Sequence, residues 1–147
     1  MRKLAIVILV SCCFFGCKKT TSQATIDDEI IKQYIFDNRL TAIAEPNGLY
    51  YAPTTVGTGA YPTDSSVVTV NYKGYLTNDT VFDNSEGPVP LALPGAIAGL
   101  QQGIPLMQAG GSAILLIPSA LGYGSQSYNH IPANAVLIYN VQMLSIH

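Results

Sequence analysis

Charged residues are scarce in this sequence. They make up 11% of its 147 residues, against about 25% in a typical soluble domain. No Asp, Glu, Lys or Arg follows Glu86, which disfavours paired catalytic carboxylates and a hydrolytic metal centre in the rest of the chain. The net charge of -2 comes without a basic patch, so a nucleic-acid partner is not expected.

Tryptophan is absent, and the three cysteines all lie close to the N-terminus, at Cys12, Cys13 and Cys17. His130 and His147 have no cysteine or second histidine clustered with them, so they form no ligand set for a metal ion. We therefore expect no metal and no cofactor. The lack of tryptophan also places a carbohydrate-binding or adhesive β-sandwich last among the functions considered.

The N-terminus is predicted to be an export signal. In residues 1–16, the basic residues Arg2 and Lys3 are followed by an apolar run that is too short for a spanning helix of about 20 residues. A Gly-Cys pair followed by two lysines and a Ser/Thr-rich stretch resembles a bacterial lipoprotein signal. We expect lipid on Cys17, with Cys12 as the alternative, or else a plain signal peptide with incidental cysteines. Lipidation would anchor the chain in the bacterial cell envelope, in our prediction at the outer membrane, facing the periplasm or the surface.

Three further segments are predicted after the signal. Residues 17–24 are polar and read as a tether, and residues 25–44 have a helical stripe of isoleucines with Thr25 as N-cap. This helix is expected to dock on the domain or to space it from the membrane; dimerisation is the alternative. Residues 45–147 form the domain.

Within that domain the pattern changes to short strands and turns. Strands are predicted over 49–55, 67–76, 81–82, 112–117 and 135–146, and a short helix over 96–102, whereas Pro88, Pro90 and Pro94 predict an irregular stretch. The fold class expected is α+β, with an antiparallel β-sheet curled around a short α-helix and preceded by an N-terminal helix.

Residues 67–147 resemble the FKBP-type peptidyl-prolyl cis-trans isomerases. Five motifs match in order, namely VTVNYKGYL (68–76), TVFDNS (80–85), LALPGAIAGLQQGIPLMQAGG (91–111), ILLIPSALGYG (114–124) and IPANAVLIYNVQMLSI (131–146). The resemblance implies an apolar pocket between sheet and helix that catalyses rotation about X–Pro bonds. The substrates expected are proline-containing exported polypeptides; the oligomeric state stays open.

The resemblance also implies the site residues. The backbone N–H of Ile97 and the Tyr123 hydroxyl would hold the substrate, and Asp83 would face its carbonyl. The catalytic set implied is Tyr72, Phe82, Asp83, Ile97 and Tyr123, and the substrate-binding set is Val89, Ala96, Leu100, Tyr128, Ile131 and Tyr139. Taken singly, the aromatic residues could be core residues, Asp83 a turn residue and Tyr123 a surface tyrosine.

An apolar pocket suits this reaction. Partial double-bond character gives amide rotation a barrier of about 18–20 kcal/mol, and rotation reduces charge separation, so an apolar environment favours the twisted amide without a nucleophile or a metal. Leu100 stands where well-studied members have Trp, Val89 replaces a common Phe, and Ala96 replaces a larger aliphatic residue. These departures predict a wider, shallower pocket, modest activity and poor binding of macrolide inhibitors. A catalytically weak or inactive FKBP-fold binding module or chaperone is the alternative function.

Overall fold

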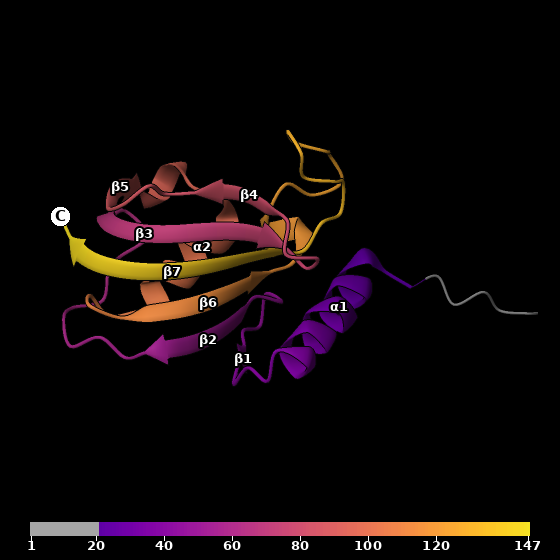
Figure 1. Cartoon of the computed structure of the whole chain (residues 1–147), viewed down its shortest axis with the longest axis horizontal. Coiled ribbons are helices and arrows are strands. Elements are labelled where there is room, and N and C mark those ends of the chain that lie inside the picture. The colour runs from indigo at the N-terminus through magenta and orange to yellow at the C-terminus, as the bar shows by residue number, and fades with distance from the viewer. Residues whose placement is uncertain (1–20) are drawn as a thin grey trace, which may run out of the picture.

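One antiparallel sheet organises the chain in the computed structural model, which describes residues 21–147 (Figure 1). The predicted signal peptide, the lipidation site at Cys17 and the start of the tether lie outside the described residues. The strand order is β1-β2-β6-β7-β3-β4, and β5 also pairs with β3. The strands are β1 (Ile43–Ala44), β2 (Tyr50–Thr55), β3 (Val67–Leu76), β4 (Val81–Asn84), β5 (Val89–Ala92), β6 (Ser112–Ile117) and β7 (Leu137–Ile146).

The helices complete the expected α+β architecture. They are α1 (Gln23–Asp37) and α2 (Ala98–Gly103), with 3₁₀ turns η1 (Leu93–Gly95), η2 (Ile104–Leu106) and η3 (Ser119–Leu121). Within the described part of the chain, no helix is long and apolar enough to cross a membrane.

The long apolar runs of the central strands are explained by burial on both faces. In β6, Leu115 and Ile117 belong to the core cluster on the α2 side, whereas Leu116 belongs to the cluster on the α1 side. Neighbouring side chains of a strand point to opposite faces, so a strand covered on both faces needs no polar alternation. β3 and β6 occupy their predicted ranges.

Helix α2 lies unusually close to β6 because two glycines face the strand. A Cβ atom on Gly99 would lie 2.4 Å from Cγ2 of Ile117, and one on Gly103 would lie 2.7 Å from Cδ1 of Leu115. Carbon atoms pack at about 3.5–4.0 Å, so larger residues would push the helix away. The helix predicted over 96–102 begins at Ala98 instead, because Ala96 and Ile97 both adopt an extended conformation.

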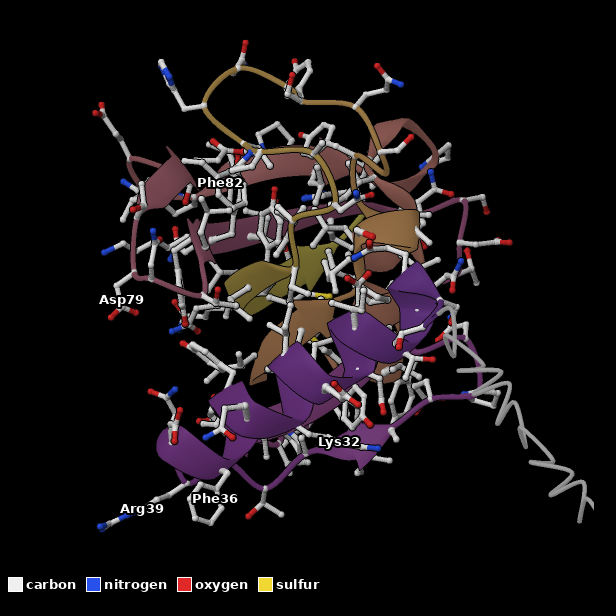
Figure 2. The ribbon with its side chains drawn as sticks, turned by 90° about the vertical axis from the view of Figure 1, so that its right-hand side faces the viewer. Lys32, Phe36, Arg39, Asp79 and Phe82 are labelled. Carbon is white, nitrogen blue, oxygen red and sulfur yellow. The ribbon has the colours of Figure 1, made fainter. Side chains whose placement is uncertain are left out.

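Helix α1 docks on the opposite face of the sheet. Ile31 is fully buried and packs in the cluster that contains Tyr50 and Ile138. The predicted range 25–44 and the N-cap Thr25 were wrong, since Ser22 is the N-cap. The helix ends at Asp37 because Arg39, which Figure 2 shows just beyond the end of α1, adopts a φ of 52°, a left-handed conformation that cannot continue a right-handed helix.

The proline-rich stretch was also predicted wrongly. It was expected to be irregular, but Val89–Ala92 forms β5 and pairs with β3. Pro90 is tolerated because β5 pairs with β3 alone, so it is an edge strand, and a proline on an edge can leave its missing N–H facing away from the partner. Strand β4 likewise continues past Phe82 to Asn84.

Candidate functional site

A small hollow lies between the sheet and the start of α2. Its volume is about 180 Å³, and we call it the inner hollow. Its lining residues come from β3, β4, β5, β7, η1, the two residues before α2, α2 itself and the loop after η3, so only the folded chain brings them together. The lining residues are Tyr72, Asp83, Leu91, Gly95, Ala96, Ile97, Leu100, Tyr123 and Tyr139.

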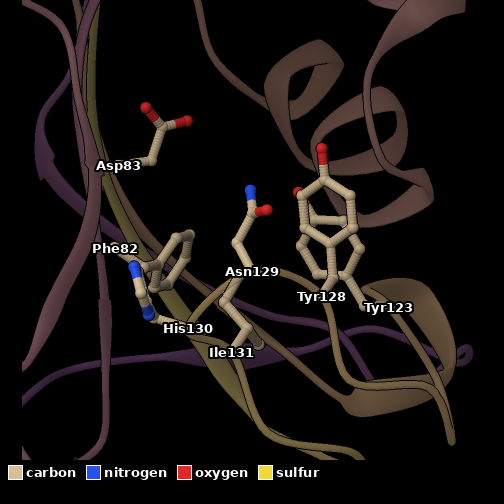
Figure 3. Close-up of a pocket in the computed structure, with 7 residues that line it drawn as sticks. All are labelled: Phe82, Asp83, Tyr123, Tyr128, Asn129, His130 and Ile131. Atoms are coloured by element: carbon tan, nitrogen blue, oxygen red, sulfur yellow. The ribbon is translucent and has the colours of Figure 1, made fainter.

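A second, larger hollow of about 470 Å³ shares Asp83 and Tyr123 with the first, and we call it the outer hollow (Figure 3). Its other residues come from β4 and from the loop between η3 and β7. The lining residues are Phe82, Asp83, Tyr123, Tyr128, Asn129, His130 and Ile131. Among both sets of lining residues, Asp83 is the only acidic side chain.

Three aromatic rings form one wall between the two hollows. The ring centroids of Tyr72 and Tyr139 are 6.0 Å apart, and those of Phe82 and Tyr139 are 5.5 Å apart in an edge-to-face arrangement. Tyr139 is only 3% exposed, and this burial raises the pKa of its hydroxyl. Edge-to-face contacts add stability beyond area burial, so the cluster holds its rings in defined positions.

Asp83 is oriented by a hydrogen bond across the β3–β4 pair. The Tyr72 hydroxyl donates to Oδ2 of Asp83 over 3.1 Å. Burial raises the pKa of the Tyr72 hydroxyl most, and the hydrogen bond to Asp83 raises this pKa further. The hydroxyl therefore remains a protonated donor. Ser85 fixes the same region, because its hydroxyl accepts from the Tyr72 N–H and donates to the Tyr72 carbonyl. Asp83 thus lines both hollows with its carboxylate held by Tyr72.

The loop after η3 presents Tyr123 and Tyr128 as a stacked pair. Their ring centroids are 4.5 Å apart with an interplanar angle of 6°, and Figure 3 shows the two rings overlapping. Burial raises the pKa of the Tyr123 hydroxyl. Tyr128 and Ile131 exchange backbone hydrogen bonds around a tight turn, and Ile131 is 4% exposed within the core. The loop is therefore held in place at Ile131 while Tyr128 remains half exposed.

Ile97 precedes α2 as its N-cap residue in an extended conformation. Its backbone N–H finds no hydrogen-bond acceptor among residues 21–147, so it is available to a ligand in the inner hollow. The Gln101 side chain donates to the carbonyl of Ala96 over 2.7 Å, which fixes the turn that presents Ile97.

Val89 is the predicted residue that neither hollow includes, since it packs against the core from β5. Leu91, two positions along the same strand, lines the inner hollow and was missed. Residues two apart on a strand share a face, but the stretch was predicted to be irregular and so had no face to assign. His130 is exposed at the outer hollow.

Within the described chain, no three His, Cys, Asp or Glu side chains gather closely enough to bind a metal ion. The lining residues instead offer apolar surface, aromatic rings, one carboxylate and a few directed donors. This arrangement can bind a small apolar group and hold an adjoining peptide backbone by hydrogen bonds.

Comparison with known proteins identifies the family. Residues 59–144 match the family described as FKBP-type peptidyl-prolyl cis-trans isomerase. The isomerase FkpA of Buchnera aphidicola subsp. Schizaphis graminum is 41% identical over 104 residues, which are 68% of this chain and 41% of the relative. FkpA of Escherichia coli strain K12 is 38% identical over 102 residues, which are 67% of this chain and 38% of the relative.

The crystal structure of FkpA from Escherichia coli superimposes with a TM-score of 0.74 at 33% identity, covering 84% of this chain and 60% of that one. The chain spans about two fifths of the length of these curated relatives. Because the family match extends over more than half of the chain, the chain belongs to the FKBP-type peptidyl-prolyl cis-trans isomerases.

Proposed function

We propose that this chain is a peptidyl-prolyl cis-trans isomerase that assists the folding of exported proteins. The observation that supports this most directly is the inner hollow, in which apolar walls stand beside the free N–H of Ile97 and the Tyr123 hydroxyl. Uncatalysed X–Pro isomerisation takes tens to hundreds of seconds and can limit folding, so exported polypeptides with proline are the substrates.

The hollow would act by favouring the twisted amide. Leu91, Leu100 and Tyr139 surround the proline ring with apolar surface, where the planar amide loses the solvation that water gives its charge separation. Asp83 faces the substrate carbonyl, and its negative charge disfavours the planar form, in which the carbonyl oxygen is most negative. These interactions are stronger in the transition state than in the ground state, which is what lowers a barrier.

The two substrate hydrogen bonds would position the chain around that ring. The N–H of Ile97 and the hydroxyl of Tyr123 donate to substrate carbonyls, and the raised pKa of the tyrosine keeps its proton in place. The flanking residues of the substrate lie in the outer hollow against Phe82 and Tyr128. Orientation of this kind requires no covalent step.

The volume of the inner hollow fits a small chemical group rather than a drug-sized molecule. Pockets for drug-sized molecules measure about 300–1,000 Å³, whereas the inner hollow measures about 180 Å³. This supports one proline ring as the occupant of the inner hollow; poor binding of macrolide inhibitors is proposed on the replacement of the common aromatic residues by Leu100 and Val89. Modest activity is expected as well, because Leu100 offers less contact than an aromatic ring would.

The location proposed is the cell envelope, with a lipid on Cys17. Fewer than ten residues separate Cys17 from α1, and an extended chain spans at most about 3.6 Å per residue, so the domain would stay close to the membrane. Metabolic labelling with radioactive palmitate tests this proposal. Cys17→Ser should abolish labelling, and Cys12→Ser is the matched control; the opposite result would move the lipid to Cys12.

A peptide assay tests the function. We expect wild-type protein at micromolar concentration to accelerate cis-trans exchange in an Xaa-Pro peptide, and Tyr123→Phe and Asp83→Val to slow it while their melting temperatures stay close to wild type. Tyr61→Phe, at a residue that is 59% exposed, is the matched control. No acceleration by wild type would overturn the enzymatic function. Unchanged protection of an aggregating client in both variants would favour the chaperone alternative.

A further inference from the structure

Helix α1 places a buried carboxylate against the turn that precedes Tyr123. Asp27 is 1% exposed and Ser119 is 2% exposed. Oδ2 of Asp27 accepts hydrogen bonds from the Ser119 N–H (2.8 Å) and the Ser119 hydroxyl (2.6 Å), while Oδ1 accepts from the Gln23 side chain (2.7 Å). A buried carboxylate is costly unless it is fully hydrogen-bonded, and here three donors satisfy it.

Ser119 continues this contact toward the site. Its carbonyl oxygen accepts from the N–H of Gly122 (3.0 Å) and the N–H of Gly124 (2.8 Å), the two residues on either side of Tyr123. The carbonyl of Gly124 in turn accepts from the N–H of Asn134 (2.8 Å) at the far end of the loop. A continuous set of hydrogen bonds therefore connects α1 with the backbone that carries Tyr123.

The two buried residues of α1 contact different parts of the domain. Ile31 packs on the sheet, in a cluster with Leu116 and Ile138. Asp27 instead contacts η3, beyond the end of β6, where Figure 1 shows α1 running beside the end of the sheet from which the loop emerges. The apolar contact of Ile31 with the sheet does not require a charged residue. The hydrogen bonds of the Asp27 carboxylate therefore serve a different purpose, which is to hold the turn at Ser119.

We propose that Asp27 is a positioning residue of the isomerase site, acting through Ser119 on the placement of the Tyr123 hydroxyl. This inference rests on the proposed function, since it assigns the Tyr123 hydroxyl to substrate binding. If Asp27 has this role, helix α1 contributes to the function of the site. It does so although it covers the opposite face of the sheet and lies outside residues 59–144, the segment that matches the family. Removing the carboxylate would free the turn without altering any group that contacts the substrate.

The test is a double-mutant cycle on the full chain with Asp27→Asn and Tyr123→Phe. A misplacement of about 1 Å can cost about 100-fold in rate, so Asp27→Asn should lower kcat/KM by about 10- to 100-fold. Once the Tyr123 hydroxyl is gone, Asp27→Asn should cost less than about twofold more. Glu29→Gln, at an exposed carboxylate of the same helix, is the matched control and should keep wild-type kcat/KM.

Two results would overturn the proposal: a folded Asp27→Asn protein with wild-type kcat/KM, or losses that multiply in the double variant. If Asp27→Asn does not fold, Ser119→Ala, which removes only the hydroxyl donor, takes its place with the same two criteria. The NMR shifts of the Tyr123 ring, stacked on Tyr128, give a second readout. If the wild type shows no activity, the proposed function fails, while a shifted Tyr123 ring in Asp27→Asn still supports the positioning role and an unchanged ring refutes it.

Discussion

Gly74 leaves space for the aromatic wall of the site, and replacing it by alanine gives a sharp prediction. Gly74 lies on β3, opposite Asp83 of β4 and Tyr139 of β7. A Cβ atom there would lie 2.8 Å from two ring atoms of Phe82 and 3.0 Å from Cε1 of Tyr139. Because carbon atoms pack at about 3.5–4.0 Å, at least one ring must move by about 0.5–1 Å.

Phe82 is the ring that will move. Tyr139 is 3% exposed and enclosed by the core, whereas Phe82 is half-buried and borders the outer hollow. Overpacking costs about 1–3 kcal/mol, and relief at Phe82 keeps Gly74→Ala near the lower end of that range. The shifted ring would enter the outer hollow, where the flanking residues of the substrate are proposed to lie, so kcat/KM should fall by about 10-fold or more. The expected signature is a small loss of stability with a large loss of activity.

The assay combines urea unfolding with the peptide isomerase assay on Gly74→Ala, Phe82→Ala and the double variant. With Phe82 truncated, the added methyl group displaces little, and Gly74→Ala should then change kcat/KM by less than about twofold. Gly95→Ala, where a Cβ atom would meet nothing within 4 Å, is the control for stability. Wild-type kcat/KM in Gly74→Ala, or effects that simply multiply, would show that the ring is not displaced.

Three further outcomes are expected. Ile31→Ala should destabilise the protein by about 2–5 kcal/mol in urea unfolding, and the matched Ile30→Ala, at a residue 37% exposed, by far less; equal losses would contradict the docking of α1. Leu100→Trp should tighten binding of a proline peptide by up to about tenfold in calorimetry, from about 0.5–1.5 kcal/mol of added aromatic contact; weaker binding would mean that the ring fills the hollow itself. The pKa of the Tyr72 hydroxyl is raised by burial and by Asp83, so its contribution to stability is complete below the ordinary tyrosine pKa of about 10 and is lost as the pH rises through the raised value. Absorbance titration should show this tyrosine ionising late, and ionisation at its ordinary pKa would refute the bond.

Much of the fold followed from local pattern. The alternation in 67–76 and the apolar run in 112–117 predicted β3 and β6 at their observed bounds. Five collinear motifs predicted the family, which the comparisons confirmed. The helix 25–44 and the stretch 88–94 were misjudged because the left-handed Arg39 and the edge position of Pro90 depend on where the chain lies in the fold.

The sequence by itself determined five of the seven strands, because strand periodicity is a property of neighbouring residues. It also determined the family, and through the family resemblance most of the residues around the inner hollow, because the order of the motifs can be seen along the chain. The tertiary structure alone decided that Leu91 rather than Val89 lines the hollow, that Tyr123 and Tyr128 stack, and that α1 covers the second face of the sheet. It also brought Asp27 to Ser119 across 92 positions of the chain. A hydrogen bond between such distant residues cannot be predicted from their spacing in the sequence, because its geometry arises only when the helix and the sheet pack together.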